Sequence, residues 1–323
     1  MIRGMLQASG DPYAVFLEPV QQELSSNNLE GTFGGIGVEI DRSQENYFLL
    51  IPFPNSPAEL SGILAGDRLL KVDELIITND TSLETIQAAL RGPVGELVQL
   101  VIGRSPTYQP QILRIRREAI QIPSILKYLE SNHPQIGVIQ INLFAKSTPE
   151  EVLNAVLDLQ GRGASRFILD LRNNGGGLLE PGIDTARLFL NSGIVLQQQY
   201  RGQALQSYSV EEPGPLADLQ FVVLINQNTA SAAEIVAGAI KAQKRAELIG
   251  TPTFGKDTIQ LVFDLSDRSS IRVTAAQWWI PGLDPPIGNN GVQPDILIPA
   301  DAPGTDPAFQ AAVSAHLRDL GIN

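Results

Sequence analysis

Between residues 226 and 260 the chain carries three side chains that together could hydrolyse a peptide bond. Ser231 follows a short Asn/Gln/Thr loop at the predicted start of a helix, Lys256 lies in a glycine-flanked turn, and Gln260 follows four residues later. A serine hydroxyl attacks a carbonyl only when a base takes its proton. A lysine can be that base if burial lowers its pKa toward neutrality. The segment therefore indicates a serine nucleophile, a lysine base and a glutamine that orients the lysine amine.

Each of these residues also has a purely structural interpretation. Ser231 begins a Ser-Ala-Ala-Glu pattern, which is a helix capping box. Lys256 has the residue type of an ordinary surface charge, and Gln260 that of a polar strand residue. The position of Ser231 favours chemistry, because it follows a predicted buried strand and stands at a helix N-terminus, where free N–H groups favour negative charge.

A glycine-rich turn, Asp-Leu-Arg-Asn-Asn-Gly-Gly-Gly at 170–177, follows another predicted buried strand. Without a Cβ, glycine lets backbone N–H groups approach a substrate carbonyl closely, as an oxyanion hole requires. The turn lacks the Lys of a phosphate-binding loop and the spacing of a dinucleotide site. A simple loop is the alternative. We expect Arg172 and Asn174 to brace the turn.

Composition excludes several other kinds of site. The 323 residues include no cysteine, so disulfides, thiolate metal sites and cysteine catalysis are excluded. His133 and His316 lie far from any nucleophile motif, which argues against a Ser-His-Asp triad. No cluster has metal-ligand spacing, so we expect neither metal nor cofactor. A net charge of -12 argues against nucleic acid and anionic membranes as partners.

The pattern of predicted elements divides the chain into three segments. Residues 1–30 read as one or two short helices that pack on the core. Residues 31–118 alternate short β-type runs with turns and one main helix, which predicts a small β-rich domain. Residues 119–323 alternate strands and helices, which predicts an α/β domain with a mostly parallel sheet covered by helices.

The chain resembles the C-terminal processing peptidases, also called tail-specific proteases. The resemblance rests on seven motifs in the family's order: GMLQASGDPYAVFL (4–17), GTFGGIGVEI (31–40), SPAELSGILAGDRLLKVD (56–73), DLRNNGGGL (170–178), TASAAEI (229–235), TFGKDTIQ (253–260) and NNGVQPDI (289–296). It implies a crotonase/ClpP-like α/β core with a PDZ domain, and a Ser231–Lys256–Gln260 triad. It also implies an oxyanion hole formed by Ala232 and one of Gly176 or Gly177, of which we favour Gly176.

The resemblance assigns a binding role to residues 31–118 as the PDZ domain. The loop Gly34-Gly35-Ile36-Gly37 is expected to present successive N–H groups to a C-terminal carboxylate, with the substrate added as a strand along the next edge. A plain turn is the alternative. The family also implies a regulatory arginine near the domain junction, which we assign to Arg117, and a PDZ rotation that gates the site.

The sequence departs from the family at a few positions. Asp257 stands where relatives commonly have Gly, and an acidic neighbour would raise the pKa of Lys256 if it pointed inward. Adjacent strand residues face opposite ways, so we expect Asp257 to point away. Glu74 replaces a turn glycine and Ala233 a serine; neither change affects the predicted chemistry.

Together these features predict a serine endopeptidase that captures apolar, unstructured protein C-termini through its PDZ domain. The alternatives are a catalytically inactive tail-binding adaptor and a crotonase-like acyl hydrolase or CoA enzyme. The resemblance favours an exported protein, although residues 1–13 lack a signal-peptide pattern, which would fit a truncated N-terminus. A homodimer is left open.

Overall fold

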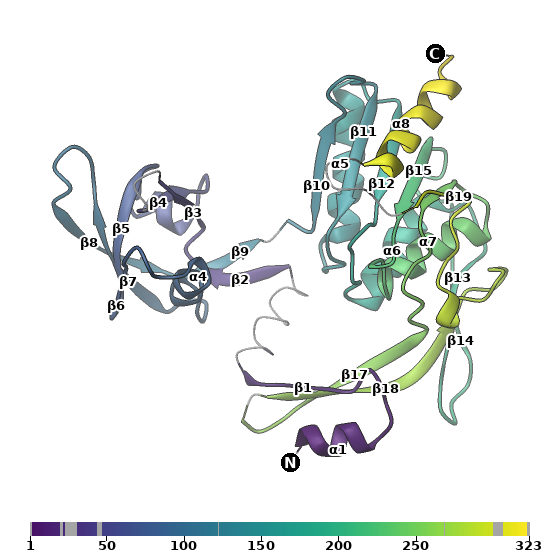
Figure 1. Cartoon of the computed structure of the whole chain (residues 1–323), viewed down its shortest axis with the longest axis horizontal. Helices are drawn as coiled ribbons and strands as arrows, with labels where there is room; N and C mark the ends of the chain where they lie inside the picture. Colours follow the sequence, from purple (N-terminus) through teal and green to yellow (C-terminus); the bar gives the residue numbers. More distant parts are fainter. Residues whose placement is uncertain are drawn as a thin grey trace. The chain divides into compact units, whose positions relative to one another are not determined.

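The computed structural model describes residues 2–19, 22, 31–43, 47–121, 123–267, 269–299 and 306–321, which form two compact units (Figure 1). The larger unit comprises Met1–Gly31 and Pro123–Asn323, and the smaller one Thr32–Ile122. The limits 31–118 and 119–323 stay predictions about where independent domains begin and end.

The larger unit is built on a six-stranded, mostly parallel sheet. Its strand order is β10 (Ile125–Leu129), β11 (Ile136–Ile141), β12 (Arg166–Asp170), β15 (Phe221–Ile225), β16 (Leu248–Gly250) and β19 (Ile296–Leu297). The pairs from β11 to β19 are parallel, and β10 pairs antiparallel with β11. Helices that pack on this sheet are α5 (Thr148–Gly161), α6 (Leu179–Phe189), α7 (Ala232–Ala242) and α8 (Pro307–Asp319). The predicted mostly parallel sheet covered by helices is confirmed.

Alternate residues of the central strands face opposite layers of helices. Phe167 and Leu169 of β12 join a core with residues of α5, α6 and α7. Ile168, between them, joins a second core with Ala308 and Ala312 of α8. Strand side chains alternate between faces, so these apolar runs bury both faces at once. The arrangement leaves the carboxyl ends of the parallel strands to carry loops.

A second, antiparallel sheet lies in the same unit. Its order is β1 (Val15–Leu17), β18 (Ser270–Trp279), β13 (Ile194–Tyr200) and β14 (Gln206–Ser209), with β17 (Thr258–Asp264) also paired to β18. The runs QLVFDL and IRVTAAQWWI, expected within the strand–helix alternation, instead form the β17–β18 hairpin. Their short connection permits antiparallel pairing only, because parallel neighbours need a longer crossover.

The N-terminal segment is only partly helical, which corrects one expectation. α1 covers Ile2–Ala8, but Val15–Leu17 is a strand that pairs with Arg272–Ser270 of β18. Its Val-Phe-Leu sequence suits a sheet edge, and the partner strand decides the outcome. Residues 20–21 and 23–30, also expected to be helical, lie outside the described residues.

The smaller unit contains a six-stranded antiparallel sheet and a separate two-stranded ribbon. The sheet order is β3 (Val38–Arg42), β4 (Phe48–Pro52), β5 (Asp67–Val72), β7 (Leu97–Gly103) and β8 (Pro110–Arg116), with β6 (Leu75–Ile76) on β5. β2 (Thr32–Gly35) pairs with β9 (Glu118–Gln121), and the two helices are α3 (Pro57–Leu60) and α4 (Leu83–Leu90). Ile86 and Leu90 of α4 share one buried core with Ile36 and Leu50.

Candidate active site

Ser231 stands in a strained backbone conformation between β15 and α7. Its φ of 56° and ψ of −120° place it in a region that non-glycine residues rarely adopt. The side chain is half-buried, and Ala232 is the first residue of α7. No described group accepts a hydrogen bond from the Ala232 N–H. A hydroxyl presented on a sharp strand-to-helix turn, beside a free N–H, suits a nucleophile.

Asn174 fixes the glycine turn to the loop before Ser231. Its side chain is fully buried, its Nδ2 donates to the Ile141 carbonyl at 2.8 Å, and its Oδ1 accepts from Gly176 N at 2.8 Å. Its own carbonyl accepts from Ala230 N at 2.9 Å. The predicted bracing role of Asn174 therefore has a physical basis, because its side chain and its carbonyl together bind groups from three segments.

Gly176 lies directly against the serine. Its φ is +103°, and a Cβ at this position would come within 2.8 Å of Ser231 Cβ. Its N–H is already bound to Asn174, however, whereas the Gly177 N–H has no partner among the described residues. The Gly177 N–H is therefore without an acceptor among the described residues, and it directly follows Gly176, whose Cβ would lie 3.1 Å from Ala232 N.

Burial makes Lys256 a plausible base. The side chain is half-buried, and burial is the largest influence lowering the pKa of Lys256, with the charge of Arg272 lowering it further. Asp11 and Glu234 act in the opposite direction. Asp257 is not among the charges that act on the lysine. The neutral amine that a general base requires is therefore favoured.

Gln260 and the N-terminal segment hold the lysine side chain. Lys256 Nζ donates to Gln260 Oε1 at 3.3 Å, and Gln260 Nε2 donates to the Tyr13 carbonyl. The Tyr13 ring lies against the Lys256 amine, with 5.1 Å from Nζ to the ring centroid. No hydrogen bond joins Lys256 Nζ to Ser231 Oγ within the described chain. The base is held in the site but does not touch the nucleophile in this arrangement.

One buried carboxylate binds the backbone of both the nucleophile and the base. Glu234 is fully buried, and its Oε2 accepts from Ser231 N and Lys256 N, each at 2.9 Å. Its Oε1 accepts from Thr253 Oγ1 and Gly255 N, each at 2.6 Å. Burial raises the pKa of Glu234, while these four donors favour its charged form. Glu234 thus links the backbone at Ser231 to the segment that carries Lys256.

Sequence patterns predict these supporting residues only in part. Glu234 was visible as the acid of the capping box, but its contacts with Thr253, Gly255 and Lys256 were not. Tyr13 lies within the family-like motif at 4–17, but nothing local connects it to Gln260. Asp11 fixes this segment by accepting from Thr274 N at 2.7 Å and from Thr274 Oγ1 at 2.9 Å.

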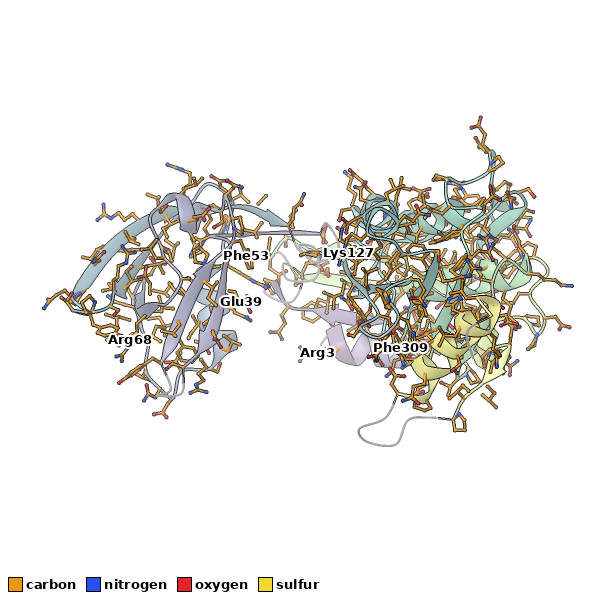
Figure 2. The ribbon with its side chains drawn as sticks, turned by 90° about the horizontal axis from the view of Figure 1, so that it is seen from above. Arg3, Glu39, Phe53, Arg68, Lys127 and Phe309 are labelled. Carbon is orange, nitrogen blue, oxygen red and sulfur yellow. The ribbon has the colours of Figure 1, made fainter. Side chains whose placement is uncertain are left out.

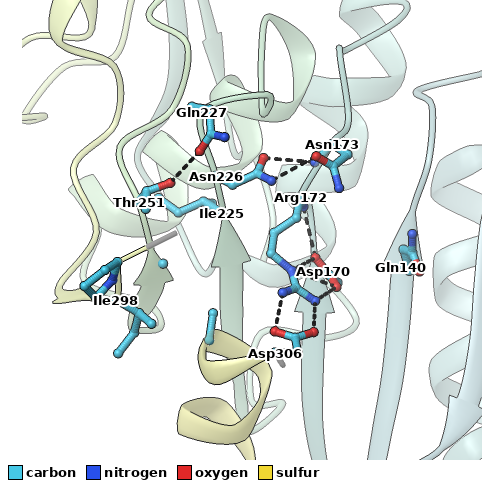
Figure 3. Close-up of a pocket in the computed structure, with 13 residues that line it drawn as sticks. Gln140, Asp170, Arg172, Asn173, Ile225, Asn226, Gln227, Thr251, Ile298 and Asp306 are labelled. Carbon is cyan, nitrogen blue, oxygen red and sulfur yellow. Dashed lines mark hydrogen bonds and ion pairs between the residues drawn. The ribbon is translucent and has the colours of Figure 1, made fainter. Parts of the chain in front are cut away.

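Arg172 stabilises the carboxyl edge of the parallel sheet. Its guanidinium contacts Asp170 and Asp306, each at 2.7 Å, in a cavity of about 450 Å³ (Figure 3). Burial alone would lower the pKa of Arg172, but the hydrogen bonds to the two carboxylates raise it. The arginine therefore braces the start of the turn, as expected, through charge pairs rather than through the glycines.

The predicted carboxylate-binding loop has free donors. Gly34 and Gly35 end β2, and the N–H groups of Ile36 and Gly37 have no partner among the described residues. Gly37 has a φ of 70°, which favours glycine. The carbonyls of Ile36 and Gly37 are held by Ala58 N and Phe53 N. The loop is therefore fixed by its carbonyls, which leaves consecutive N–H groups for an anion.

Arg117 is buried inside the smaller unit. Its Nε donates to the Leu90 carbonyl at 3.0 Å and its Nη2 to the Ala89 carbonyl at 3.1 Å. A cation at the C-terminus of α4 satisfies carbonyls that the helix itself leaves unpaired. The contacts show Arg117 as a helix cap, and its regulatory role stays a prediction.

Comparison with known families gives the site its context. A model described as peptidase family S41 matches residues 135–298, which include the glycine turn, Ser231, Lys256 and Gln260. The chain belongs to peptidase family S41. A PDZ domain model matches residues 54–104, a range that leaves out the loop at 34–37 and Arg117. This S41 chain is thus a serine-type C-terminal processing peptidase with a PDZ domain, as the motifs predicted.

Similar proteins cover almost the whole chain. A carboxyl-terminal-processing protease of Picosynechococcus sp. is 37% identical over 98% of this chain and 78% of its own length. The carboxy-terminal processing protease CtpA of Bacillus subtilis is 32% identical over 100% of this chain and 68% of its own. Among solved structures, a photosystem II D1 C-terminal processing protease is 30% identical, with a TM-score of 0.53, over 97% of this chain and 84% of that one.

Proposed function

We propose that this S41 peptidase cleaves proteins that it captures by an apolar C-terminus, using Ser231 as nucleophile, Lys256 as base and Gln260 as orienting residue. The observation that supports this most directly is the shared carboxylate of Glu234, which binds the backbone N–H groups of both Ser231 and Lys256. Nucleophile and base thus stand at fixed points of one hydrogen-bonded unit. Such positioning is what general-base catalysis requires.

In the reaction, Ser231 Oγ attacks the peptide carbonyl while the neutral amine of Lys256 takes its proton. Lys256 then gives that proton to the departing amine, which leaves an acyl-serine that water hydrolyses with the same base. Because Nζ does not contact Oγ in this structure, the lysine side chain must approach the serine before attack. Gln260, anchored on Tyr13, limits the directions from which Nζ can come.

For the oxyanion we propose the N–H groups of Gly177 and Ala232. Both are unpaired in the described chain, whereas the N–H of Gly176, favoured from the sequence, is bound to Asn174. Each donor aimed at the developing charge is worth about 3 kcal/mol of barrier. Gly176 still matters under this assignment, because only a residue without a side chain fits beside Ser231.

For substrate capture we propose the loop Gly34-Gly35-Ile36-Gly37 of the smaller unit. The unpaired N–H groups of Ile36 and Gly37 suit a terminal carboxylate, and the tail would extend from them as an added strand. An unfolded tail is required, since a strand can be added only by an extended chain. We also propose that the core is related in fold to crotonase and ClpP. We further propose that rotation of the PDZ domain gates the site, with Arg117 as the regulatory residue, and that the peptidase can form a homodimer.

An exported location is also part of the proposal. No helix among the described residues is long and apolar enough to cross a membrane. One similar protein, from Arabidopsis thaliana, is named as a chloroplastic carboxyl-terminal-processing peptidase. Fractionation of the source cells with an antibody to the chain would test the location.

The test of function is degradation of an unfolded reporter that ends in a free apolar C-terminus. We expect cleavage by the wild type and none by Ser231→Ala or Lys256→Ala. The same reporter with an amidated C-terminus should be cleaved at least tenfold more slowly, because the loop N–H groups lose their anion. Equal cleavage by the wild type and Ser231→Ala would overturn the assignment of the nucleophile.

A further inference from the structure

The smaller unit leaves one strand edge open next to the proposed carboxylate loop. β3 is the last strand of its sheet, and in the described chain it pairs only with β4. It starts at Val38, directly after the loop Gly34–Gly37. A tail whose carboxylate sits at that loop must run toward it, and therefore antiparallel to β3. This geometry assigns each tail residue to a face of the sheet.

The two faces of β3 differ in chemistry. Val38 and Ile40 are partly buried and pack against the core of the unit. Glu39, between them, and Asp41, which follows Ile40, are exposed. Residues opposite one another in an antiparallel pair share a face, so the last tail residue and the third from the end lie on the apolar side. The penultimate residue lies on the side of Glu39, and the fourth from the end on the side of Asp41.

Glu39 is an unpaired carboxylate beside an apolar surface. It makes no hydrogen bond or ion pair with any described residue. Its cross-strand partner is Ile51, which is 37% exposed. Phe53, the residue after β4, is 41% exposed and is labelled with Glu39 in Figure 2. A long basic side chain can lay its aliphatic stem on such a surface and bring its charge to the carboxylate.

Asp41 offers a weaker site because a cation lies in its row. Its partner Leu49 pairs in turn with Arg68 of β5, so Asp41 and Arg68 share a face two strands apart. Two strand spacings are about 10 Å, close to the screening length at physiological salt. Arg68 therefore offsets part of the field of Asp41, whereas the described residues opposite Glu39 carry no cation.

We propose that Glu39 makes this peptidase select tails whose C-terminal residue is apolar and whose penultimate residue is lysine or arginine. The inference rests on the proposed function, since it assumes capture of the C-terminus at the loop. It adds a charge preference that the loop alone does not supply. The same reasoning ranks the positions: a basic residue next to Asp41 contributes less than one next to Glu39.

The test uses the full chain carrying Ser231→Ala, so that bound tails are not cleaved. Fluorescein-labelled decapeptides share an apolar C-terminal leucine and differ only in Lys, Ala or Glu at the penultimate position. Fluorescence anisotropy gives their Kd values at low and high salt. We expect Lys to bind about two- to fivefold more tightly than Ala, and Glu correspondingly less tightly, as befits an exposed ion pair.

Substitutions at Glu39 provide the decisive comparison. Glu39→Gln should remove the preference and Glu39→Lys should reverse it, while Glu74→Gln, which removes a charge elsewhere in the unit, should leave it intact. The preference should also shrink in high salt. If all free-carboxylate peptides bind equally well, the role of Glu39 is wrong and tail capture stands. If no such peptide binds, the proposed tail capture fails, and the role of Glu39 fails with it.

Discussion

Replacing Glu234 by glutamine tests whether one carboxylate positions both proposed catalytic residues, Ser231 and Lys256. The two oxygens accept four hydrogen bonds, two at each. An amide keeps one oxygen but turns an NH₂ group toward the other pair of donors. Two hydrogen bonds to a charged acceptor are lost, at about 1.5–3 kcal/mol each. The lower cost of burying a neutral side chain offsets part of this loss.

We therefore expect Glu234→Gln to lower the free energy of unfolding of the larger unit by about 2–4 kcal/mol, a fall of roughly 5–15 °C in Tm. Catalysis should suffer more than stability. The amide oxygen can serve only one pair of donors: the N–H groups of Ser231 and Lys256, or the Thr253 hydroxyl and the Gly255 N–H. The other pair faces the NH₂ group, which displaces either Ser231 and Lys256 themselves or the segment that leads into Lys256. A shift of about 1 Å between nucleophile and base costs about 10²-fold in rate.

The assay is kcat/KM on the unfolded reporter, measured well below the Tm of every variant, together with thermal unfolding. Glu151→Gln is the matched control, because Glu151 also lies in the first turn of a helix and accepts from Ser124 N at 2.8 Å and from Ser147 Oγ. It should lose stability and keep kcat/KM. If Glu234→Gln folds and keeps kcat/KM within twofold of the wild type, the positioning role is refuted.

Three further outcomes follow from the site and the core. Gly176→Ala should lower kcat/KM by more than 10²-fold, because its Cβ would lie 2.8 Å from Ser231 Cβ, whereas Gly175→Ala, with open space around it, should be close to wild type. Burial lowers the pKa of Lys256, so kcat/KM should rise with pH through that lowered value. Between that lowered pKa and 10.5 the unfolded wild-type chain binds more protons than the folded one, so the wild type gains stability as pH rises. Lys256→Met lacks this gain, so its Tm relative to the wild type should fall from pH 7 to pH 10. Burial likewise lowers the pKa of His316, so unfolding stability should decline as pH falls below 6.5, and His316→Gln should flatten that decline in thermal scans.

The sequence was most informative where the chemistry is local. Ser231, Lys256 and Gln260 lie within one segment of the chain, and their motifs have fixed spacing. The buried strands at 166–171 and 221–226 were also visible, since each is a continuous apolar run between turn residues. Such patterns specify the residues of a local motif and the buried faces of individual strands and helices.

Contacts between distant segments were beyond such patterns. Val15–Leu17 became a strand because β18 offers it an edge, although the partner lies some 250 residues away. The link from Gln260 to Tyr13 spans 247 residues. The bond between Asn174 and Gly176 is local, but it depends on a side-chain rotamer that residue types alone do not determine. That one bond moved the proposed oxyanion donor from Gly176 to Gly177.

The way Glu234 holds the site has a practical consequence. Glu234 accepts hydrogen bonds from the main-chain N–H groups of Ser231 and Lys256, so the hydroxyl and the amine of these residues take no part in the contacts with Glu234. Removing the hydroxyl of Ser231 or the amine of Lys256 should therefore abolish the proposed activity and keep the hydrogen bonds between the backbone and Glu234. A Ser231→Ala form should therefore retain bound substrates instead of releasing products, and tails recovered with it from its own cellular compartment would identify what this peptidase processes.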